Sequence, residues 1–379
     1  MRRIRRIAIP PLHNLGEKRA IAGDLKMPKT YKNIFEGIYD FSNLYDAYLK
    51  ARKEKRYREG VLFYTSNLEN NLVRLMNEIK EGVYRPGKYH TFSVYEPKKR
   101  KISSLPFKDR IVQHALNNVI EPIFEKVFIY DSYACRKYKG THSGVRRLTH
   151  FLRSLSAGAY CFKGDIANYF PSVSHNILRR EIARRISDKR ALALIDTIIF
   201  SHCAVGKTDC GLPVGNLTSQ LFANVYMNQL DYFVKHNLHC RHYIRYVDDF
   251  IVLDEDKKKL AAVKDEIEFF LRDDLRLALN KKSSIFPVKQ GVDFLGYRIW
   301  RTHRLLRKSS VKKMKKKIAE FAAGGIIPEK MEATVASWLA HSRHADTYNL
   351  TKKLASLMGK HSQFLSKIML NRINPGAAS

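Results

Sequence analysis

The sequence predicts an α+β fold, and three observations lead to this prediction. Apolar runs on both sides of Asp248-Asp249 are typical of two β-strands joined by a tight turn. Another apolar run, residues 161–166, predicts a further strand with Asp165 close to its end. Apolar residues spaced by three and four positions predict helices within residues 31–82, 175–200 and 257–279.

Three aspartates at strand ends are the candidate catalytic groups. Adjacent carboxylates repel one another, so the pair Asp248-Asp249 is best explained by a divalent cation between them. Asp165 supplies a third carboxylate, and such a trio fits a two-metal site for phosphoryl transfer, with the ions about 4 Å apart. A solvated turn is the alternative. The pair Asp273-Asp274, inside a helical pattern, shows that two aspartates alone indicate little.

The composition indicates a polyanionic partner. The 379 residues include 69 Lys and Arg against 36 Asp and Glu, a formal net charge of +33. Such a surplus favours nucleic acid, because each phosphate contact releases condensed counterions. An anionic membrane is the rival partner, but the sequence has no run of about 18 apolar residues, so we expect no membrane contact. Five scattered cysteines without Cys-x-x-Cys spacing indicate reduced thiols and argue against a zinc site.

Four basic segments stand out along the chain. Residues 1–26 predict a basic N-terminal arm. The run Arg52–Arg58 is either a solvated face or a phosphate contact. Residues 89–105 alternate as a strand pair, and their basic turn at 97–101 is costly unless it meets an anion. Residues 301–317 contain nine Lys and Arg and no acid beside one thin apolar stripe, which predicts a basic helix.

Several motifs together resemble reverse transcriptases, in the order typical of that family. Tyr246–Asp249 resembles the active-site box, and 162–171 resembles the first catalytic box. Residues 211–220 resemble the box between these two, and 277–283 and 294–297 resemble the two boxes that follow. The resemblance extends from about Tyr84 to Trp300.

The resemblance implies a right-hand polymerase fold with fingers, a palm that contains an antiparallel sheet, and a helical thumb. We expect fingers at 27–160, with 175–214 returning toward them, and a palm at 161–297. The thumb is expected at 298–373, followed by a disordered tail at 374–379.

For the chemistry, the resemblance implies RNA-templated DNA synthesis from dNTPs with two Mg²⁺ ions, or Mn²⁺ in vitro. Asp165 and Asp248 would be the main metal ligands, with Asp249 in support. The resemblance also places six residues at the nucleotide: Arg100 or alternatively Lys98 at the triphosphate, Phe170 as a steric gate against the 2′-hydroxyl, Val214 and Gly215 beside the nascent pair, and Lys282 as general acid. A core role for Phe170 and a solvated position for Lys282 are the alternatives.

Other residues are expected to bind the template RNA and the cDNA/RNA duplex. Arg136 either touches the template backbone or forms a structural ion pair. The segment Leu295-Gly296-Tyr297 resembles the primer grip. Along the basic helix, the duplex contacts are expected from Lys312, Lys313, Lys315 and Lys316.

The 211–220 box departs from the pattern of many reverse transcriptases. Val214-Gly215 and Ser219-Gln220 stand where Gln-Gly and Ser-Pro are common, and this resembles the enzymes of diversity-generating retroelements. That subgroup implies a structured template RNA, misincorporation opposite adenine, a small basic pentameric accessory protein and the cytoplasm of a bacterium, encoded there or by a phage. A group II intron or retron reverse transcriptase is the alternative, and an RNA-binding scaffold without catalysis is a third class.

Overall fold

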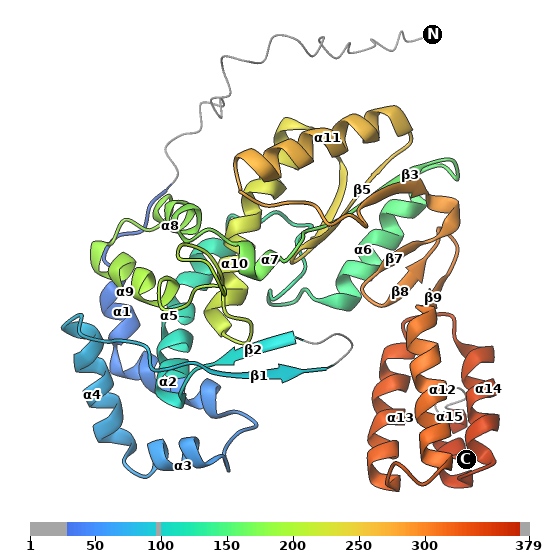
Figure 1. The fold of residues 1–379 in the computed structure, drawn as a ribbon, viewed down its shortest axis with the longest axis horizontal. Helices are drawn as coiled ribbons and strands as arrows, with labels where there is room; N and C mark the ends of the chain where they lie inside the picture. The colour runs from blue at the N-terminus through green and yellow to red at the C-terminus, as the bar shows by residue number, and fades with distance from the viewer. Residues whose placement is uncertain (1–28, 96–99, 372–379) are drawn as a thin grey trace.

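The computed structural model describes residues 29–95 and 100–371, and Figure 1 shows its elements. The basic arm predicted at 1–26, Lys98 and the tail predicted at 374–379 lie outside the described residues. Helices and antiparallel sheets occur together in the described chain, as the predicted α+β class requires.

Helices form the first part of the described chain, within the 31–82 region that the apolar spacing predicted to be helical. They are α1 (Phe35–Tyr39), α2 (Phe41–Arg52), α3 (Glu59–Thr65) and α4 (Leu68–Lys80). The carboxylate of Asp40 accepts hydrogen bonds from the backbone N–H groups of Ser42 and Asn43 and so caps α2. The longer α5 (Phe107–Glu125) packs against α2, and α6 (Thr141–Arg153) follows it in the chain.

The predicted strand pair is confirmed as an antiparallel hairpin of β1 (His90–Val94) and β2 (Arg100–Ser104). In Figure 1 this hairpin extends from the helical body toward the bundle at the C-terminal end. The backbone N–H of Ser103 donates to the carbonyl of Val214 at 2.9 Å, which fixes β2 against the 211–220 segment.

The central sheet contains the candidate catalytic residues. Its strands are β3 (Tyr160–Asp165), β4 (His242–Tyr246), β5 (Asp249–Asp254) and β6 (Ser284–Pro287), arranged in the order β4-β5-β3-β6 with every neighbouring pair antiparallel. Alternate residues of β5 belong to different core clusters, Phe250 and Val252 to one and Ile251 and Leu253 to the other. The sheet is therefore buried on both faces, as the continuous apolar run of β5 requires.

Helices cover both faces of this sheet. Those that follow β3 are α7 (Tyr169–Ser172), α8 (His175–Ala183), α9 (Lys189–Ile199), α10 (Leu217–Tyr232) with a π-helical extension over Phe233–Asn237, and α11 (Lys257–Asp273). The prediction of one helix over 257–279 is wrong at its end. Leu275 and Leu277 are buried, but they lie in the loop after α11, so their apolar character reflects packing and not helical structure.

A second sheet and a helical bundle complete the chain. The segment that resembles the primer grip lies in a hairpin of β7 (Val292–Phe294) and β8 (Tyr297–Ile299), and β9 (Arg304–Leu306) pairs with β8. The basic helix predicted within residues 301–317 begins only at Lys308, because β9 occupies the residues before it. The bundle consists of α12 (Lys308–Ala322), α13 (Pro328–Ser342), α14 (Tyr348–Gly359) and α15 (Gln363–Asn371), and it stands apart from α1–α5 across an open space in Figure 1.

Candidate active site

The sheet brings the three predicted aspartates together. Asp165, the last residue of β3, lies directly opposite Asp249, the first residue of β5, in the antiparallel register. Asp248 lies in the turn between β4 and β5, and its carbonyl accepts a hydrogen bond from the N–H of Ile166 at 3.3 Å. Opposed like charges on one sheet face are destabilising unless a cation compensates them, so the register itself favours a cation site.

Burial and mutual repulsion raise the pKa of two of these carboxyls. Burial raises the pKa of Asp249 to about 6; Lys163 opposes this shift, whereas Asp165 and Asp248 add to it. The pKa of Asp248 is also raised, first by burial and then by Asp165, while Arg100 and Arg245 act in the opposite direction. The positive charge of Arg100 on β2 therefore influences the Asp248 carboxyl in the turn.

Lys163 is a component of the site that the sequence reasoning did not identify. Its ammonium lies 3.6 Å from Oδ2 of Asp249 and donates to the carbonyl of Asp293 at 2.8 Å. Lys163 precedes Asp165 by two residues on β3, so both side chains project from the same face of the sheet. In the sequence, the position of Lys163 two residues before the strand-end Asp165 could have indicated that it belongs to the site.

Arg245 is a second component that was missed. Its side chain is fully buried and forms an ion pair with Asp231 on α10, with Nη2 to Oδ2 at 2.6 Å. The same guanidinium donates to the carbonyl of Val247 at 2.9 Å. Val247 has a φ of 56°, a left-handed conformation that a β-branched residue rarely adopts. Arg245 thus anchors the turn that presents Asp248. In the sequence, an arginine within a buried strand could have indicated this structural role.

The carboxylates fit the divalent ions that the sequence predicted. Oδ1 of Asp249 is buried and has no hydrogen-bond partner among the described residues. In the described ranges, no group of three or more His, Cys, Asp or Glu side chains is arranged to hold a metal ion by itself. Mg²⁺, however, commonly takes only one or two carboxylates and completes its shell with water and substrate phosphates. An open set of oxygen ligands therefore suits this ion.

Phe170 and Gly215, two of the residues predicted at the nucleotide, contact other parts of the protein. Phe170 is half-buried, and its ring meets that of Tyr169 edge to face at 5.5 Å. Gly215 has a φ of 116°, and a side chain there would come within 2.8 Å of Ile102 and 3.3 Å of the Ser103 carbonyl. Gly215 therefore packs closely against β2, and its contact with a nucleotide stays a prediction.

Lys282 is exposed, and it lies in a turn that is hydrogen-bonded to the backbone of Asp165. Its N–H donates to Oδ1 of Asn280 at 3.1 Å, and the N–H of Asn280 donates to the carbonyl of Asp165 at 2.7 Å.

Arg136 forms the structural ion pair that was the alternative to a template contact. Its Nη2 lies 2.6 Å from Oε1 of Glu125, and its side chain is 6% exposed. Its Nη1 also donates to the carbonyls of Ile129 and Ser132, at 2.7 and 2.9 Å. These bonds engage the guanidinium within the protein.

The segment resembling a primer grip is a hairpin turn. Leu295 and Gly296 form the turn with φ values of 50° and 92°, whereas Tyr297 is buried and its hydroxyl donates to the carbonyl of His341 at 2.8 Å. Leu295 is partly buried against the core, and Tyr297 joins β8 to α13. The side chains of Lys312, Lys313, Lys315 and Lys316 are exposed on α12.

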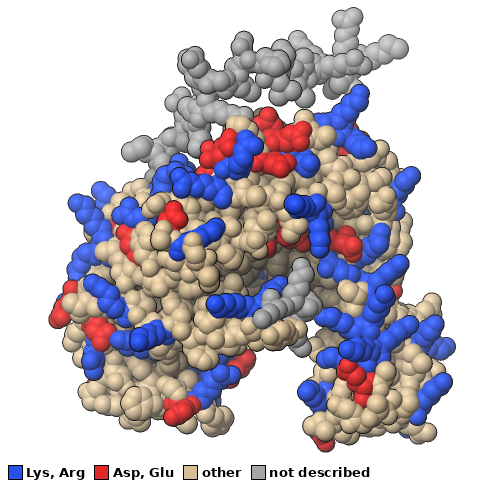
Figure 2. Space-filling view, in the orientation of Figure 1, with Lys and Arg blue, Asp and Glu red and all other residues tan. Residues whose placement is uncertain are grey.

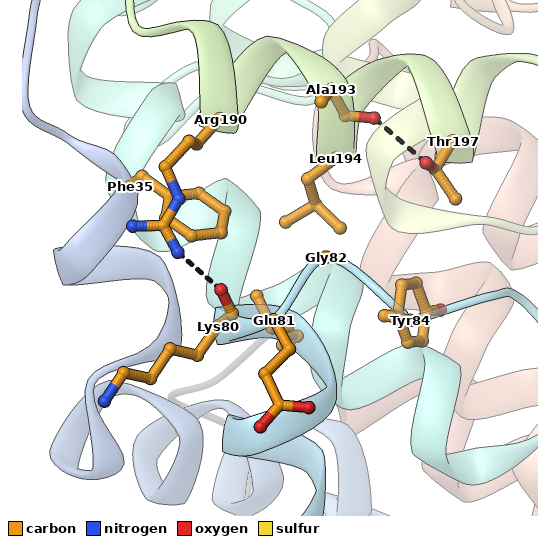
Figure 3. Close-up of a pocket in the computed structure, with 10 residues that line it drawn as sticks. Phe35, Lys80, Glu81, Gly82, Tyr84, Arg190, Ala193, Leu194 and Thr197 are labelled. Atoms are coloured by element: carbon orange, nitrogen blue, oxygen red, sulfur yellow. Dashed lines mark hydrogen bonds between the residues drawn. The ribbon is translucent and has the colours of Figure 1, made fainter.

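The surface around this region is hollowed and charged. Figure 2 shows acidic side chains in the central hollow of this face and many Lys and Arg side chains along its rim. A separate hollow of about 300 Å³ lies among α1, α4 and α9. There Arg190 stacks on Phe35 with 4.4 Å to the ring centroid and donates to the Lys80 carbonyl at the end of α4, so the contacts join elements of the helical body (Figure 3).

Among the described residues, no helix is long and apolar enough to span a membrane.

Comparison with known proteins gives consistent relatives. YkfC of Escherichia coli (strain K12) is 30% identical over 279 residues, covering 62% of this chain and 71% of YkfC. The group II intron-encoded protein LtrA of Lactococcus lactis subsp. cremoris is 23% identical over 329 residues, and the match covers 67% of this chain but only about half (54%) of LtrA. Among solved structures, apo telomerase from Candida tropicalis aligns with a TM-score of 0.46 and 13% identity, covering 76% of this chain and 62% of that chain.

The family model described as reverse transcriptase (RNA-dependent DNA polymerase) matches residues 90–299. This range exceeds half of the chain, includes the central sheet and contains Asp165, Asp248 and Asp249. The chain therefore belongs to the reverse transcriptase family of RNA-dependent DNA polymerases.

Proposed function

We propose that this chain synthesises cDNA on a structured template RNA and uses Asp165, Asp248 and Asp249 to hold two Mg²⁺ ions, with Mn²⁺ as a substitute in vitro. The main support is the register of the central sheet, which sets Asp165 opposite Asp249 beside the turn that contains Asp248. When bound, the ions would supply charge stabilisation at the attacking and leaving oxygens. The protein's own contribution is the fixed position of three half-buried carboxylates at the edge of the central sheet.

The surrounding residues are proposed to position the substrates. The charge of Arg100 opposes the upward shift in the pKa of Asp248, so a dNTP triphosphate bound beside Asp248 would meet this cation on the β2 side. Phe170 would lie under the sugar as the gate, and Lys282 would neutralise the departing pyrophosphate. Leu295 and Gly296 would contact the primer, and the exposed lysines of α12 would follow the cDNA/RNA duplex.

We further propose that the enzyme belongs to a diversity-generating retroelement and works with the small basic pentameric accessory protein typical of that class. The support is the 211–220 box, in which Val214 replaces a hydrogen-bonding glutamine. The carbonyl of Val214 accepts a hydrogen bond from Ser103 on β2. Its side chain is a hydrocarbon and offers shape without a hydrogen bond. A misaligned nucleotide then loses little transition-state binding energy relative to a correct one. Each tenfold of discrimination requires a difference of about 1.4 kcal/mol in that energy.

The test is sequencing of cDNA made from a defined RNA template with balanced dNTPs. We expect frequent errors opposite adenine, faithful copying of the other bases, and a changed error rate for Val214→Gln. Equal, low error rates opposite all four bases would leave the second candidate, a group II intron-type enzyme. That candidate is supported by the match to LtrA, which is named a group II intron-encoded protein. Because YkfC and LtrA are bacterial proteins, we propose a bacterial cytoplasmic setting for either candidate.

A further inference from the structure

A basic and aromatic surface on the helical body is separate from the carboxylates. We define the α3 patch as residues 53–58, the outer residues Leu62 and Phe63 of α3, and Arg110 on α5. Residues 53–58 line a hollow of about 540 Å³. In Figure 1, α3 lies at the lower edge of the helical body, below the β1–β2 hairpin, whereas the turn between β4 and β5 lies within the sheet above.

The cations of the α3 patch lack acidic partners. From Lys50 to Arg58 the chain contains six Lys and Arg and one acid, Glu54. None of these six, nor Arg110, forms an ion pair within the described part of the chain, which makes them unlike Arg136 or Arg147. The pKa of Lys55 is lowered by burial and then by Arg110 and Arg58, and burial and Arg58 lower the pKa of Arg110. A bound anion would offset the mutual repulsion of these cations.

Exposed aromatic rings lie among these cations. Tyr57 is 92% exposed and Phe63 is 80% exposed, although the neighbouring Val61 and Tyr64 of α3 are buried in the core. Large apolar side chains exposed together mark an interaction surface. Rings interleaved with cations suit unpaired nucleotides, because bases stack on the rings while phosphates meet the cations. An acidic protein would use the cations but would leave the two rings without a role.

We propose that the α3 patch is a second RNA-binding site, which holds single-stranded RNA outside the carboxylate site by base stacking on Tyr57 and Phe63 and phosphate contacts with Lys53, Arg56 and Arg58. The inference rests on the proposed RNA-templated function for the source of its ligand. Its ligand class is single-stranded RNA and not duplex, because stacking on exposed rings needs an unpaired base.

The binding test uses the full chain and a labelled, unstructured oligouridine RNA. Tyr57→Ala with Phe63→Ala should weaken binding about tenfold or more, since stacking contributes roughly 1–3 kcal/mol per base. Tyr57→Phe with Phe63→Tyr keeps both rings and should bind like the parent. Lys53→Gln, Arg56→Gln and Arg58→Gln together should make the slope of log affinity against log salt shallower by about two, at about 0.7 per phosphate contact. The matched control is Lys257→Gln, Lys258→Gln and Lys264→Gln on α11, which should change neither quantity.

Primer extension separates this inference from the proposed function. On a template with a two-nucleotide overhang, the Tyr57→Ala and Phe63→Ala variant should extend like the parent, whereas on a long single-stranded overhang it should bind more weakly. Equal loss on both templates would overturn the inference by assigning α3 to the catalytic track or to folding. Parent-like oligouridine binding would also overturn it, and retained binding to polyglutamate would then indicate an acidic protein partner. A parent that binds oligouridine at the patch but extends no primer would contradict the proposed function alone.

Discussion

At the scale of single residues, the buried pair Arg245–Asp231 explains how a strained turn is held. Tyr243 donates to the same aspartate at 2.7 Å, so Asp231 is bonded to both side chains from β4. Breaking a buried ion pair costs about 3–5 kcal/mol, because the remaining charge has no partner. Substitution of Arg245 therefore tests the fold of the turn together with catalysis, and it is a poor probe of chemistry alone.

Lys163 offers a cleaner probe because it is partly exposed and contacts Asp249 directly. Its ammonium favours the ionised form of Asp249, whose pKa is raised to about 6. Lys163→Met should raise that pKa further, so the acid limb of the rate–pH profile should move to higher pH. The measurement is single-turnover primer extension between pH 5.5 and 9 with Mg²⁺ below saturation, where protons and cations compete for the carboxylate.

The matched control for Lys163 is Lys259→Met. Lys259 pairs at 2.8 Å with Asp254, the last residue of β5, far along the strand from Asp249, the first. This variant should retain the acid limb of the parent. An unshifted limb in Lys163→Met would show that Lys163 has no influence on the active carboxylate.

His114 predicts how stability depends on pH. The pKa of His114 is lowered to about 4. Burial is the largest cause, and the positive charges of Lys50 and Lys55 add to the shift. The unfolded imidazole, with a pKa of about 6.5, binds a proton before the folded one does. The contribution of His114 to stability is therefore intact above about pH 6.5 and is lost as the pH falls toward 4. His114→Gln should make the melting temperature less sensitive to pH in this window; an unchanged slope between pH 4 and 6.5 would contradict the assignment.

At the scale of elements, the contact between β2 and the 211–220 segment shows what sequence patterns predict and what they miss. The hairpin followed from period-two alternation, and Gly215 followed from the resemblance. The residue that Gly215 contacts could not be predicted from the sequence, since only the tertiary structure shows that a side chain at Gly215 would meet Ile102. Similarly, the three aspartates were predicted because strand ends can be read locally, whereas Lys163–Asp249 and Arg245–Asp231 pair residues from different elements.

The helix α12 supplies a prediction about nucleic-acid affinity. Met314 and Ile318 face the bundle core, and the lysines at 312, 313, 315 and 316 point outward. Replacing all four lysines by glutamine should weaken duplex binding and reduce its salt slope by about 3.6, at about 0.9 per lost phosphate contact. The four Lys→Arg replacements keep the charge and should preserve the slope. Titration of a cDNA/RNA duplex by fluorescence anisotropy at several salt concentrations measures both; an unaltered slope after neutralisation would exclude α12 from the duplex path.

At the scale of the whole molecule, the net charge of +33 and the carboxylate site have complementary roles. Positive side chains around the central hollow attract a polyanion, while the acidic groups within it favour divalent ions (Figure 2). The right-hand arrangement expected from the resemblance corresponds to the helical body with its hairpin, the central sheet and the separate bundle in Figure 1. Under the proposed function, the charge would provide binding and the three aspartates would provide the chemistry.

The most direct test of this account is primer extension on an RNA template by Asp248→Asn. The amide removes a negative ligand from a half-buried turn without removing a core side chain, so we predict a loss of about a thousandfold in rate, or about 4 kcal/mol, with parent-like melting and RNA affinity. Asp274→Asn, in the exposed pair after α11, is the matched control and should extend normally. Primer extension by Asp248→Asn at the parent's rate would contradict the assignment of the active site.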